Sequence, residues 1–432
     1  MWEKLFNYLK KDKKFIYLDK ASTKSINEKY NKLLYYENKV NFQNLSSISP
    51  QSVRNKKILN KIVEVFRIWF ESPDYHFIFT SGATESLNLA FKGVAFQYLL
   101  NKKNKENRLN IVLSKVEHKA GLEIAKFIKE LGFEIRYIPI LNSGVINDLQ
   151  LKNLIDGNTI LVSLPYINNE TGNIQPLKKV GLLKEKYDFI FHCDVTASLA
   201  NGPFNLTYYG IDLASFSAHK MCGIKGIGGI AVKNINRLCP LIHGGGQQYG
   251  LRGGTENFPA LKVWGFYLEN KLNTYKEDQK KIQSLDLYCI KKFKNEFKEQ
   301  LTFNSLISNK KRLAGIINLS IKDISNLDLV AFLANKNIYI GTGSACNNIN
   351  FKESEVFNAM GISEKEQQSV LRISFDEEND FYEFDQLINN IRIFKANMEN
   401  NQNEENKEES SPDCESYRIL AFKYWYKRLK GE

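Results

Sequence analysis

Residues 213-LASFSAHKMCGIKGIGGIAV-232 place two apolar, strand-like runs on either side of a turn made of small residues. Lys220 lies at this turn, between a histidine and a series of glycines. In a chain with 60 Lys and Arg residues, a lysine is by default a solvated surface residue. The patterns on either side of the stretch favour another interpretation of this lysine.

Helical and strand-like patterns alternate from about residue 55 to 233. The expected buried strands are 76-HFIFT-80, 109-LNIVLS-114, 134-EIRYIPI-140, 159-TILVSLPYI-167 and 189-FIFHCDV-195, besides the two runs of the first stretch. Helical patterns lie before or between them, at 55–70, 85–100, 121–131 and 176–187. This alternation predicts an α/β fold, a largely parallel sheet with helices on both faces. In such folds ligands bind at the carboxyl ends of the strands.

The pattern changes after the glycine-rich segment 243-HGGGQQYGLRGGTEN-257. The elements expected there are a long polar helix over about 262–300, strands near 313–320 and 337–341, and helices near 325–335 and 382–396. We therefore expect a large domain over residues 15–262 and a smaller α+β domain over 263–396, with residues 1–14 packed on the smaller one. Residues 397–432 should comprise a disordered polar linker and a short basic, aromatic tail, either a docking helix or folded back.

The composition narrows the class of protein. The net charge of +12 would suit a nucleic-acid binder, but the basic residues are spread through the chain, so no direct nucleic-acid contact is expected. No apolar run is long enough to span a membrane, and the N-terminal segment is charged too often for a signal peptide. The six cysteines form no C-x-x-C pair. This argues against a metal site or a disulfide framework and favours a reducing, cytoplasmic setting.

Four loops that follow expected strands carry polar groups suited to one cofactor. The small residues of 80-TSGATES-86 let backbone N–H groups converge on an anion, although taken alone they are equally an ordinary helix start. Asp194 ends a buried strand, where a carboxylate needs a cation. His118 and Lys220 follow two other strands. Together these groups suit pyridoxal phosphate (PLP): Asp194 for its pyridine nitrogen, Lys220 for a covalent bond, and His118 for its ring face.

Eight stretches of the sequence carry a family resemblance: 15-FIYLDKAST-23, 79-FTSGATESLNLAFKG-93, 117-EHKAGLE-123, 167-INNETGNIQPL-177, 192-HCDVTAS-198, 215-SFSAHKMCGIKGIGG-229, 243-HGGGQQYGLRGGTEN-257 and 341-GTGSACNN-348. In order and spacing they resemble the cysteine desulfurases, in the class V group of fold type I PLP-dependent enzymes. The resemblance runs from about Phe15 to about Ile393. It implies a seven-stranded, mostly parallel sheet in the large domain, and the PLP-dependent removal of sulfur from L-cysteine with release of L-alanine.

The resemblance also implies roles for single residues. Lys220 would bond to PLP, His118 would stack on its ring, and Asp194 would pair with its pyridine nitrogen. The positions matched to the phosphate are Ala83, Thr84, Ser217 and His219, with Thr255 reaching the phosphate of the other subunit in a homodimer. Asn169 would lie beside the ring and the substrate, and Arg372 would bind the substrate carboxylate through its bidentate guanidinium.

Cys346, in 341-GTGSACNNIN-350, decides the expected reaction. A lone cysteine is more often a buried, inert side chain, but this one has small and polar neighbours. It matches the sulfur acceptor of the family. The resemblance therefore implies that its thiolate takes the sulfur of L-cysteine as a persulfide and passes it to an acceptor protein, for iron–sulfur cluster assembly or tRNA thiolation.

Three positions depart from the family pattern. Ala197 replaces a glutamine that donates to the phenolic oxygen of PLP, Pro50 replaces a histidine, and Asp376 replaces a glycine. The sequence leaves two alternatives to a cysteine desulfurase: a selenocysteine lyase or another class V PLP enzyme, and a weakly active sulfur carrier or scaffold. The retained residues of the expected site argue against a scaffold.

Overall fold

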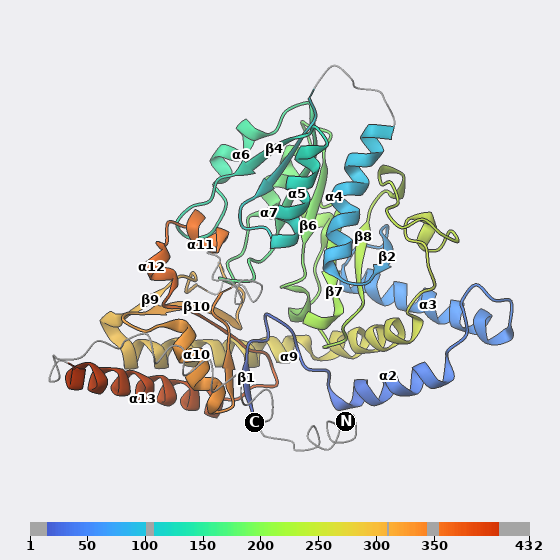
Figure 1. The fold of residues 1–432 in the computed structure, drawn as a ribbon. Coiled ribbons are helices and arrows are strands. Elements are labelled where there is room, and N and C mark those ends of the chain that lie inside the picture. The colour runs from blue at the N-terminus through green and yellow to red at the C-terminus, as the bar shows by residue number, and fades with distance from the viewer. Residues whose placement is uncertain (1–14, 101–107, 309–310, 344–353, 406–432) are drawn as a thin grey trace.

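A computed structural model describes residues 15–100, 108–308, 311–343 and 354–405 (Figure 1). In this part of the chain the main sheet has the strand order β2 (His76–Thr80), β8 (Gly228–Val232), β7 (Leu213–Ser217), β6 (Ile190–Asp194), β5 (Thr159–Pro165), β3 (Asn110–Ser114) and β4 (Glu134–Ile138). Strand β8 is antiparallel to both of its neighbours, and the other adjacent pairs are parallel. The expected mostly parallel, seven-stranded sheet is confirmed.

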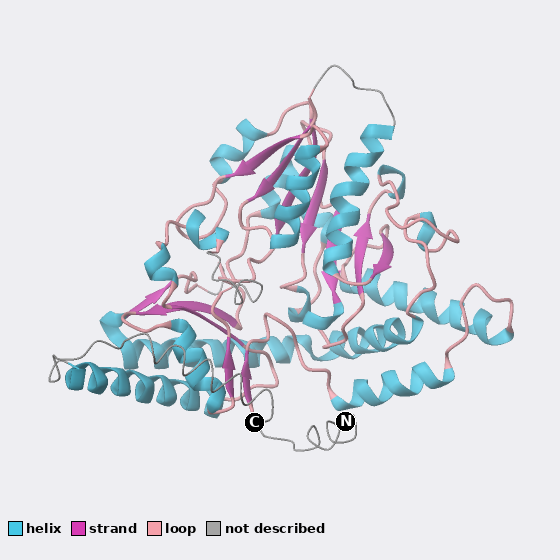
Figure 2. Ribbon diagram, viewed as in Figure 1, coloured by secondary structure: helices cyan, strands magenta, loops and turns pink. Residues whose placement is uncertain are grey.

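Alternate residues of the strands point to opposite faces of this sheet and enter two separate cores. In β2, Phe77 and Phe79 pack in the core that also contains residues of α3 (Pro50–Trp69) and of the first half of α9 (Phe258–Phe297). Ile78 faces the other core, with α4 (Ala83–Leu100) and α5 (Lys119–Glu130). Figure 2 shows these helices around the strands of the main sheet. Both faces of the sheet are therefore covered, as the alternation of helical and strand-like patterns predicted.

Further helices flank the main sheet and the second region of the chain. They are α2 (Glu28–Val40), α6 (Asp148–Leu154), α7 (Leu177–Leu183), α8 (Leu206–Tyr209), α11 (Glu355–Ala359) and α12 (Glu364–Gln367). Among the described helices, none combines the length and the apolar character needed to cross a bilayer.

A third core lies around two small sheets. One sheet is antiparallel, in the order β12 (Val370–Ser374), β10 (Ile316–Ile321) and β9 (Leu301–Phe303), and the other pairs β1 (Ile16–Leu18) with β11 (Ile338–Ile340) in parallel. Helices α10 (Asn326–Asn335) and α13 (Phe381–Glu405) pack with the second half of α9 around the same core. We propose the two domains expected from the sequence, with β1 assigned to the smaller one because Leu18 is buried in its core.

Besides the assignment of β1, two boundaries differ from the sequence-based expectation. The boundary expected at residues 262 and 263 falls inside α9, whose side chains pack on the core of the large domain as far as Tyr275 and on that of the small domain from Ile282. Helix α13 continues to Glu405, so the expected disordered linker is corrected for residues 397–405. Glu, Gln and Met in this polar run extend a helix that is already nucleated by packed turns. Residues 1–14 and the tail after Glu405 lie outside the described residues.

Candidate active site

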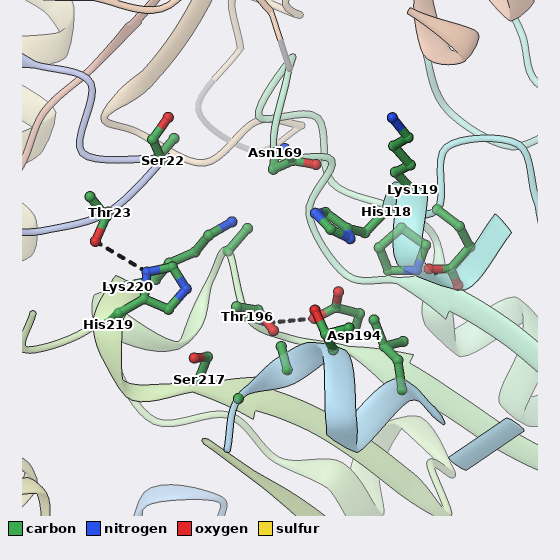
Figure 3. A pocket seen from close by; sticks show the side chains of 18 of the residues that line it. Ser22, Thr23, His118, Lys119, Asn169, Asp194, Thr196, Ser217, His219 and Lys220 are labelled. Carbon is green, nitrogen blue, oxygen red and sulfur yellow. Dashed lines mark hydrogen bonds between the residues drawn. The ribbon is translucent and has the colours of Figure 1, made fainter. Parts of the chain in front are cut away.

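A cavity of about 690 Å³ lies at the carboxyl ends of the parallel strands, next to the small domain. The expected site residues that line it are Ala83, Thr84, His118, Asn169, Asp194, Ser217, His219, Lys220 and Arg372. Figure 3 shows the side chains of Lys220, Asp194, His118 and Asn169 directed into the same space. The structure therefore brings together residues that are up to 289 positions apart in the sequence, from Ala83 to Arg372.

The loop before α4 forms one end of the cavity. The first N–H groups of α4, at Ala83 and Thr84, have no acceptor within their own helix, which makes this end suitable for an anion. Gly82 lies so close to β8 that a Cβ atom on Gly228 would be 2.6 Å from the Gly82 Cα. The absence of a side chain at Gly228 is thus what allows the loop to take this position.

His219 and Thr23 also line the cavity. The Nδ1 atom of His219 is 3.2 Å from the Thr23 hydroxyl oxygen (Figure 3). Burial and the nearby ammonium of Lys220 lower the pKa of His219 to about 4. The imidazole is therefore neutral at pH 7 and acts as a hydrogen-bonding group rather than a cation.

Asp194 and His118 face each other across the cavity. Asp194 ends β6 in a buried position, where its Oδ1 accepts a hydrogen bond of 2.9 Å from the backbone N–H of Thr196 (Figure 3). His118 caps the N-terminus of α5, and its Nδ1 accepts a hydrogen bond of 3.1 Å from the backbone N–H of Ala120. Burial, followed by the positive charge of Lys220, lowers the pKa of His118. A neutral, fixed imidazole can lie against a flat ring.

A buried chain of polar side chains that the sequence analysis did not identify lies beside Asp194. The Ser163 hydroxyl donates to Glu117 Oε1 over 2.6 Å and lies 2.8 Å from His192 Nδ1, and His192 Nε2 lies 2.8 Å from the Ser215 hydroxyl. Burial raises the pKa of Glu117 to about 8 and lowers that of His192 to about 4, so both are neutral at pH 7. The sequence feature that could have indicated Glu117 is its position directly before the site histidine, in 117-EHKAGLE-123.

Arg372 lies in the middle of β12 and is fully buried. Its Nη2 donates to Asp19 Oδ1 and to the Ser22 hydroxyl, each over 2.7 Å, and its Nη1 donates to the carbonyl of Asn169 over 3.1 Å. A Cβ atom on Gly341 would be 3.1 Å from the guanidinium nitrogens, so the glycine leaves room for them. Asp19 and Ser22 belong to the matching stretch 15-FIYLDKAST-23, but the sequence analysis gave them no role.

Of the expected site residues that the structure describes, Thr255 does not line the cavity. Thr255 is exposed, and its hydroxyl accepts a hydrogen bond of 3.4 Å from the side chain of Asn44. Cys346 lies outside the described residues. The described residues on either side of that segment, Gly343 and Ser354, both lie beside the buried carboxylate of Glu170, which lines the cavity.

The three departures from the family pattern have separate surroundings. Ala197 lines the cavity. Pro50 is the first residue of α3, whose N-cap is Ser49, a position where proline is well tolerated. Asp376 is buried and paired with Lys20 and Lys24.

Known proteins are similar to this chain in sequence and in fold. The family described as aminotransferase class V matches residues 16–387. Cysteine desulfurase IscS of Dictyoglomus turgidum is 33% identical over 350 residues, which cover 81% of this chain and 86% of the relative. This chain belongs to the class V aminotransferase family, among its cysteine desulfurases. Cysteine desulfurase IscS of Rickettsia massiliae, at 35% identity over 317 residues, covers 73% of this chain and 74% of the relative.

Solved structures agree with the fold. A NifS-like protein superposes with a TM-score of 0.80 at 27% identity, over 89% of this chain and all of the other. A structure described as SspA in complex with cysteine gives a TM-score of 0.72 at 29% identity, over 83% of this chain and 98% of the other. The fold type I architecture and the PLP-dependent class expected from the sequence are confirmed.

Proposed function

We propose that this class V enzyme transfers the sulfur of L-cysteine to Cys346 and releases L-alanine. The observation that carries the proposal is that one cavity combines Lys220, Asp194 and His118 with a buried arginine. The first three suit PLP, and the arginine suits the carboxylate of an amino acid. The segment that contains Cys346 joins the described chain beside this cavity, at Gly343 and Ser354.

PLP bound in this cavity would supply an electron sink for bonds broken at the amino-acid substrate. The N–H groups at Ala83 and Thr84, with Ser217 and His219, would bind its phosphate. Asp194 would keep its pyridine nitrogen protonated, and His118 would lie on its ring.

The substrate would be oriented by Arg372 and Asn169. Arg372 would bind the carboxylate of L-cysteine with its guanidinium, which Asp19 and Ser22 hold in place. The Nζ atom of Lys220 would take a proton from the substrate Cα, deliver one to its Cβ after the C–S bond breaks, and return one to Cα. Fixing both partners in one geometry supplies much of the rate gain in such reactions.

In the sulfur step the new bond forms between the substrate sulfur and Cys346. The Cys346 thiolate attacks the sulfur of bound L-cysteine, so an S–S bond forms as the C–S bond breaks. The electron pair of the C–S bond remains on the carbon, which takes up a proton and becomes the methyl group of L-alanine. The products are L-alanine and a persulfide on Cys346, so atoms and electrons balance without a further reactant.

We also propose a homodimer and an acceptor protein for the persulfide sulfur, in iron–sulfur cluster assembly or tRNA thiolation. Thr255 is exposed beside Asn44 and outside the cavity of its own chain, in keeping with a contact to the cavity of a partner subunit. The four cysteines in the described part of the chain are all free, which supports a reducing compartment such as the cytoplasm.

The test is to incubate the PLP-loaded enzyme with L-cysteine and to measure L-alanine, sulfide and the mass of the peptide that contains Cys346. We expect L-alanine in proportion to the total sulfur released, and one additional sulfur atom on that peptide. The same assay with selenocysteine separates the selenocysteine lyase alternative, which requires much faster selenide release. An enzyme that forms no L-alanine from either substrate would contradict the proposed function.

A further inference from the structure

The short segment that follows β1 contacts the cavity with one set of its side chains. Asp19 and Ser22 accept hydrogen bonds from Arg372, each over 2.7 Å. Thr23 lies 3.2 Å from the imidazole of His219. This segment therefore contacts two cavity residues that come from different domains, Arg372 from the small one and His219 from the large one.

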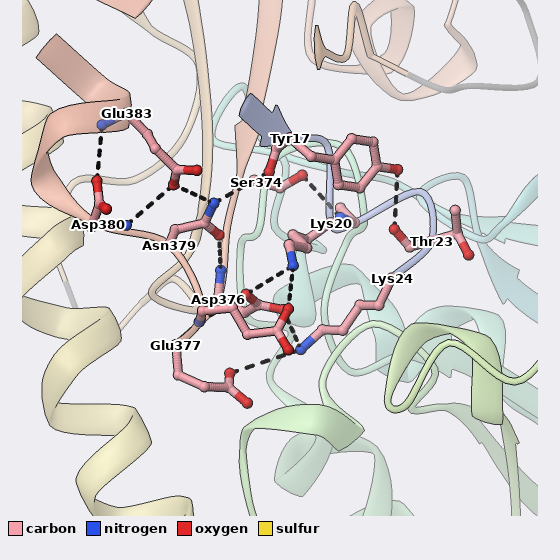
Figure 4. Close-up of polar contacts among 12 residues, drawn as sticks. Tyr17, Lys20, Thr23, Lys24, Ser374, Asp376, Glu377, Asn379, Asp380 and Glu383 are labelled. Carbon is pink, nitrogen blue, oxygen red and sulfur yellow. Dashed lines mark hydrogen bonds and ion pairs between the residues drawn. The ribbon is translucent and has the colours of Figure 1, made fainter. Parts of the chain in front are cut away.

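Two lysines of the same segment point into a buried ion cluster (Figure 4). Lys24 Nζ is 2.9 Å from Asp376 Oδ2, and Lys20 Nζ is 3.2 Å from Asp376 Oδ1. The exposed fractions of the side chains are 10% for Lys24, 7% for Lys20 and 4% for Asp376, so three charges are removed from water together. Burial alone would raise the pKa of Asp376, but the ammoniums of Lys24 and Lys20 lower it to about 2.

Asp376 is also fixed from its own side of the cluster. Its Oδ1 accepts from the backbone N–H of Glu378 over 3.2 Å, and its own N–H donates to Asn379 Oδ1 over 3.0 Å (Figure 4). A glycine at this position, as in the family pattern, would leave two buried ammoniums without their shared carboxylate. Removing one member of such a buried group is strongly unfavourable. Asp376, Lys20 and Lys24 thus form one unit, which we call the clamp.

The backbone of the segment is tied to both domains at the same places. The N–H of Lys20 donates to the carbonyl of Ser374 over 3.1 Å, and the N–H of Ala21 donates to the Ser374 hydroxyl over 2.9 Å. The N–H of Lys24 donates to the carbonyl of His219 over 3.1 Å. Any shift of the clamped lysines therefore moves the groups that hold the cavity side chains.

We propose that Asp376 is a positioning residue for substrate binding, which acts through Lys20 and Lys24 on the segment that orients Arg372. The inference rests on the proposed role of Arg372 in binding the substrate carboxylate. A bidentate pair with a carboxylate requires a fixed guanidinium plane. With the clamp broken, Asp19 and Ser22 no longer hold that plane in one orientation, and binding of L-cysteine weakens.

The variant Asp376→Asn tests the inference because it removes the charge and keeps the size. We expect the KM for L-cysteine to rise roughly tenfold while kcat changes less than about twofold. Amide hydrogen exchange in the peptide over residues 16–24 should also become faster, a readout that does not depend on turnover. The matched control is Asp385→Asn, which removes the carboxylate 2.7 Å from Lys292 at the surface of the small domain and should leave both readouts unchanged.

The outcomes separate this inference from the proposed function. An unchanged KM, or unchanged exchange over residues 16–24, in Asp376→Asn overturns the clamp, as does a loss confined to kcat. If Asp376→Asn does not fold, KM and hydrogen exchange are measured in Lys20→Gln instead. This variant is milder, because the second partner of Lys20, Glu378, is half exposed and can be solvated when the lysine is removed. Arg372→Lys is the reference variant. If it leaves the KM for L-cysteine unchanged, the proposed role of Arg372 in substrate binding is wrong. If Arg372→Lys raises KM but Asp376→Asn does not, only the role of the clamp is wrong.

Discussion

The carboxyl group of Glu117 and the imidazole of His192 are hydrogen-bonded to the same hydroxyl, that of Ser163, over 2.6 and 2.8 Å. Because the pKa of His192 is lowered to about 4, its ring is neutral and has one N–H to donate. Since Ser163 donates to Glu117, it accepts from His192 Nδ1–H, and His192 Nε2 accepts from Ser215. The chain of hydrogen bonds therefore has one direction, towards a carboxyl group that carries its own proton at pH 7.

The raised pKa of Glu117 predicts a loss of stability as the pH rises. Between about pH 4.5 and 8 the unfolded chain releases this proton and the folded enzyme keeps it, so the contribution of Glu117 to the free energy of unfolding falls with increasing pH in this window. Glu117→Gln replaces the protonated carboxyl with a neutral group of similar shape and should remove this slope. Urea unfolding of both proteins, followed by circular dichroism at about pH 5, 6, 7 and 8, measures the free energy of unfolding at each pH. Parallel curves for the two proteins would mean that Glu117 is ionised in the folded enzyme.

Lys220→Ala should abolish both the visible absorbance of the lysine-bound cofactor and the release of L-alanine. The reason is that Lys220 is proposed as the covalent ligand of PLP and as the group that moves protons. The measurements are the absorption spectrum after PLP addition and an L-alanine assay. Lys233→Ala, at an exposed lysine after β8, is the control and should keep both. Residual turnover near the wild-type rate in Lys220→Ala would contradict the site assignment.

Cys346→Ser should keep the bound cofactor and the binding of L-cysteine but form no persulfide. A serine hydroxyl is a poor nucleophile towards sulfur and cannot store it. Mass spectrometry of the peptide over residues 341–350, after incubation with L-cysteine, measures the product. Cys222→Ser is the control, because burial raises the pKa of Cys222 to about 12 and keeps that thiol unreactive. If Cys346→Ser still released sulfide at the normal rate, another acceptor would have to be sought.

The strands of the main sheet were predictable because each is a short apolar run between turn residues. An example is 109-LNIVLS-114, which contains β3 and ends with it at Ser114. Strand β12 was not recognised as one, since Arg372 interrupts its apolar run and is buried only through partners far along the chain. Helix α2 was missed because one face of it carries exposed aromatic side chains, Tyr35 and Tyr36, which blur the amphipathic pattern.

The cavity was predictable to the extent that its residues follow strands of one parallel sheet or match family stretches. Lys220, Asp194 and His118 were found in this way. The partners of Asp376 were not, because Lys20 is 356 positions away and nothing in the local sequence links the two. Charges that are paired across such distances are set by tertiary packing, and periodicity carries no information on them.

Gly228→Ala should weaken the retention of PLP and destabilise the enzyme. The new Cβ atom would be 2.6 Å from the Gly82 Cα and 2.8 Å from the carbonyl oxygen of Phe216, and both contacts are with backbone that must shift. Overpacking of this kind costs about 1–3 kcal/mol. Absorbance titration of the cofactor-free enzyme with PLP and thermal unfolding are the measurements. Gly157→Ala, where a Cβ atom would meet no neighbour within 4 Å, is the control; equal behaviour of the two variants would show that the loop tolerates the shift.

Ala197→Gln should lower the pKa at which the visible absorbance of the lysine-bound cofactor titrates. Ala197 lines the cavity at the position where the family pattern has a donor to the phenolic oxygen of PLP. The neighbouring Thr196 uses its N–H for Asp194, over 2.9 Å, and directs its hydroxyl to the carbonyl of Ser215, over 3.5 Å. In this structure both groups of Thr196 are therefore directed at other acceptors.

The size of the shift follows from the hydrogen bond that the new glutamine side chain of the Ala197→Gln variant would donate. A donor stabilises the phenolic oxygen most when the cofactor has lost its titrating proton, because the oxygen then lacks its internal partner. One hydrogen bond to a charged group contributes about 1.5–3 kcal/mol. This corresponds to a decrease of about one to two pKa units at roughly 1.36 kcal/mol per unit. Spectral titrations of both proteins in parallel measure it, with Ala197→Leu as a control that fills the space without a donor; superimposable curves for wild type and Ala197→Gln would mean that the oxygen is already fully hydrogen-bonded.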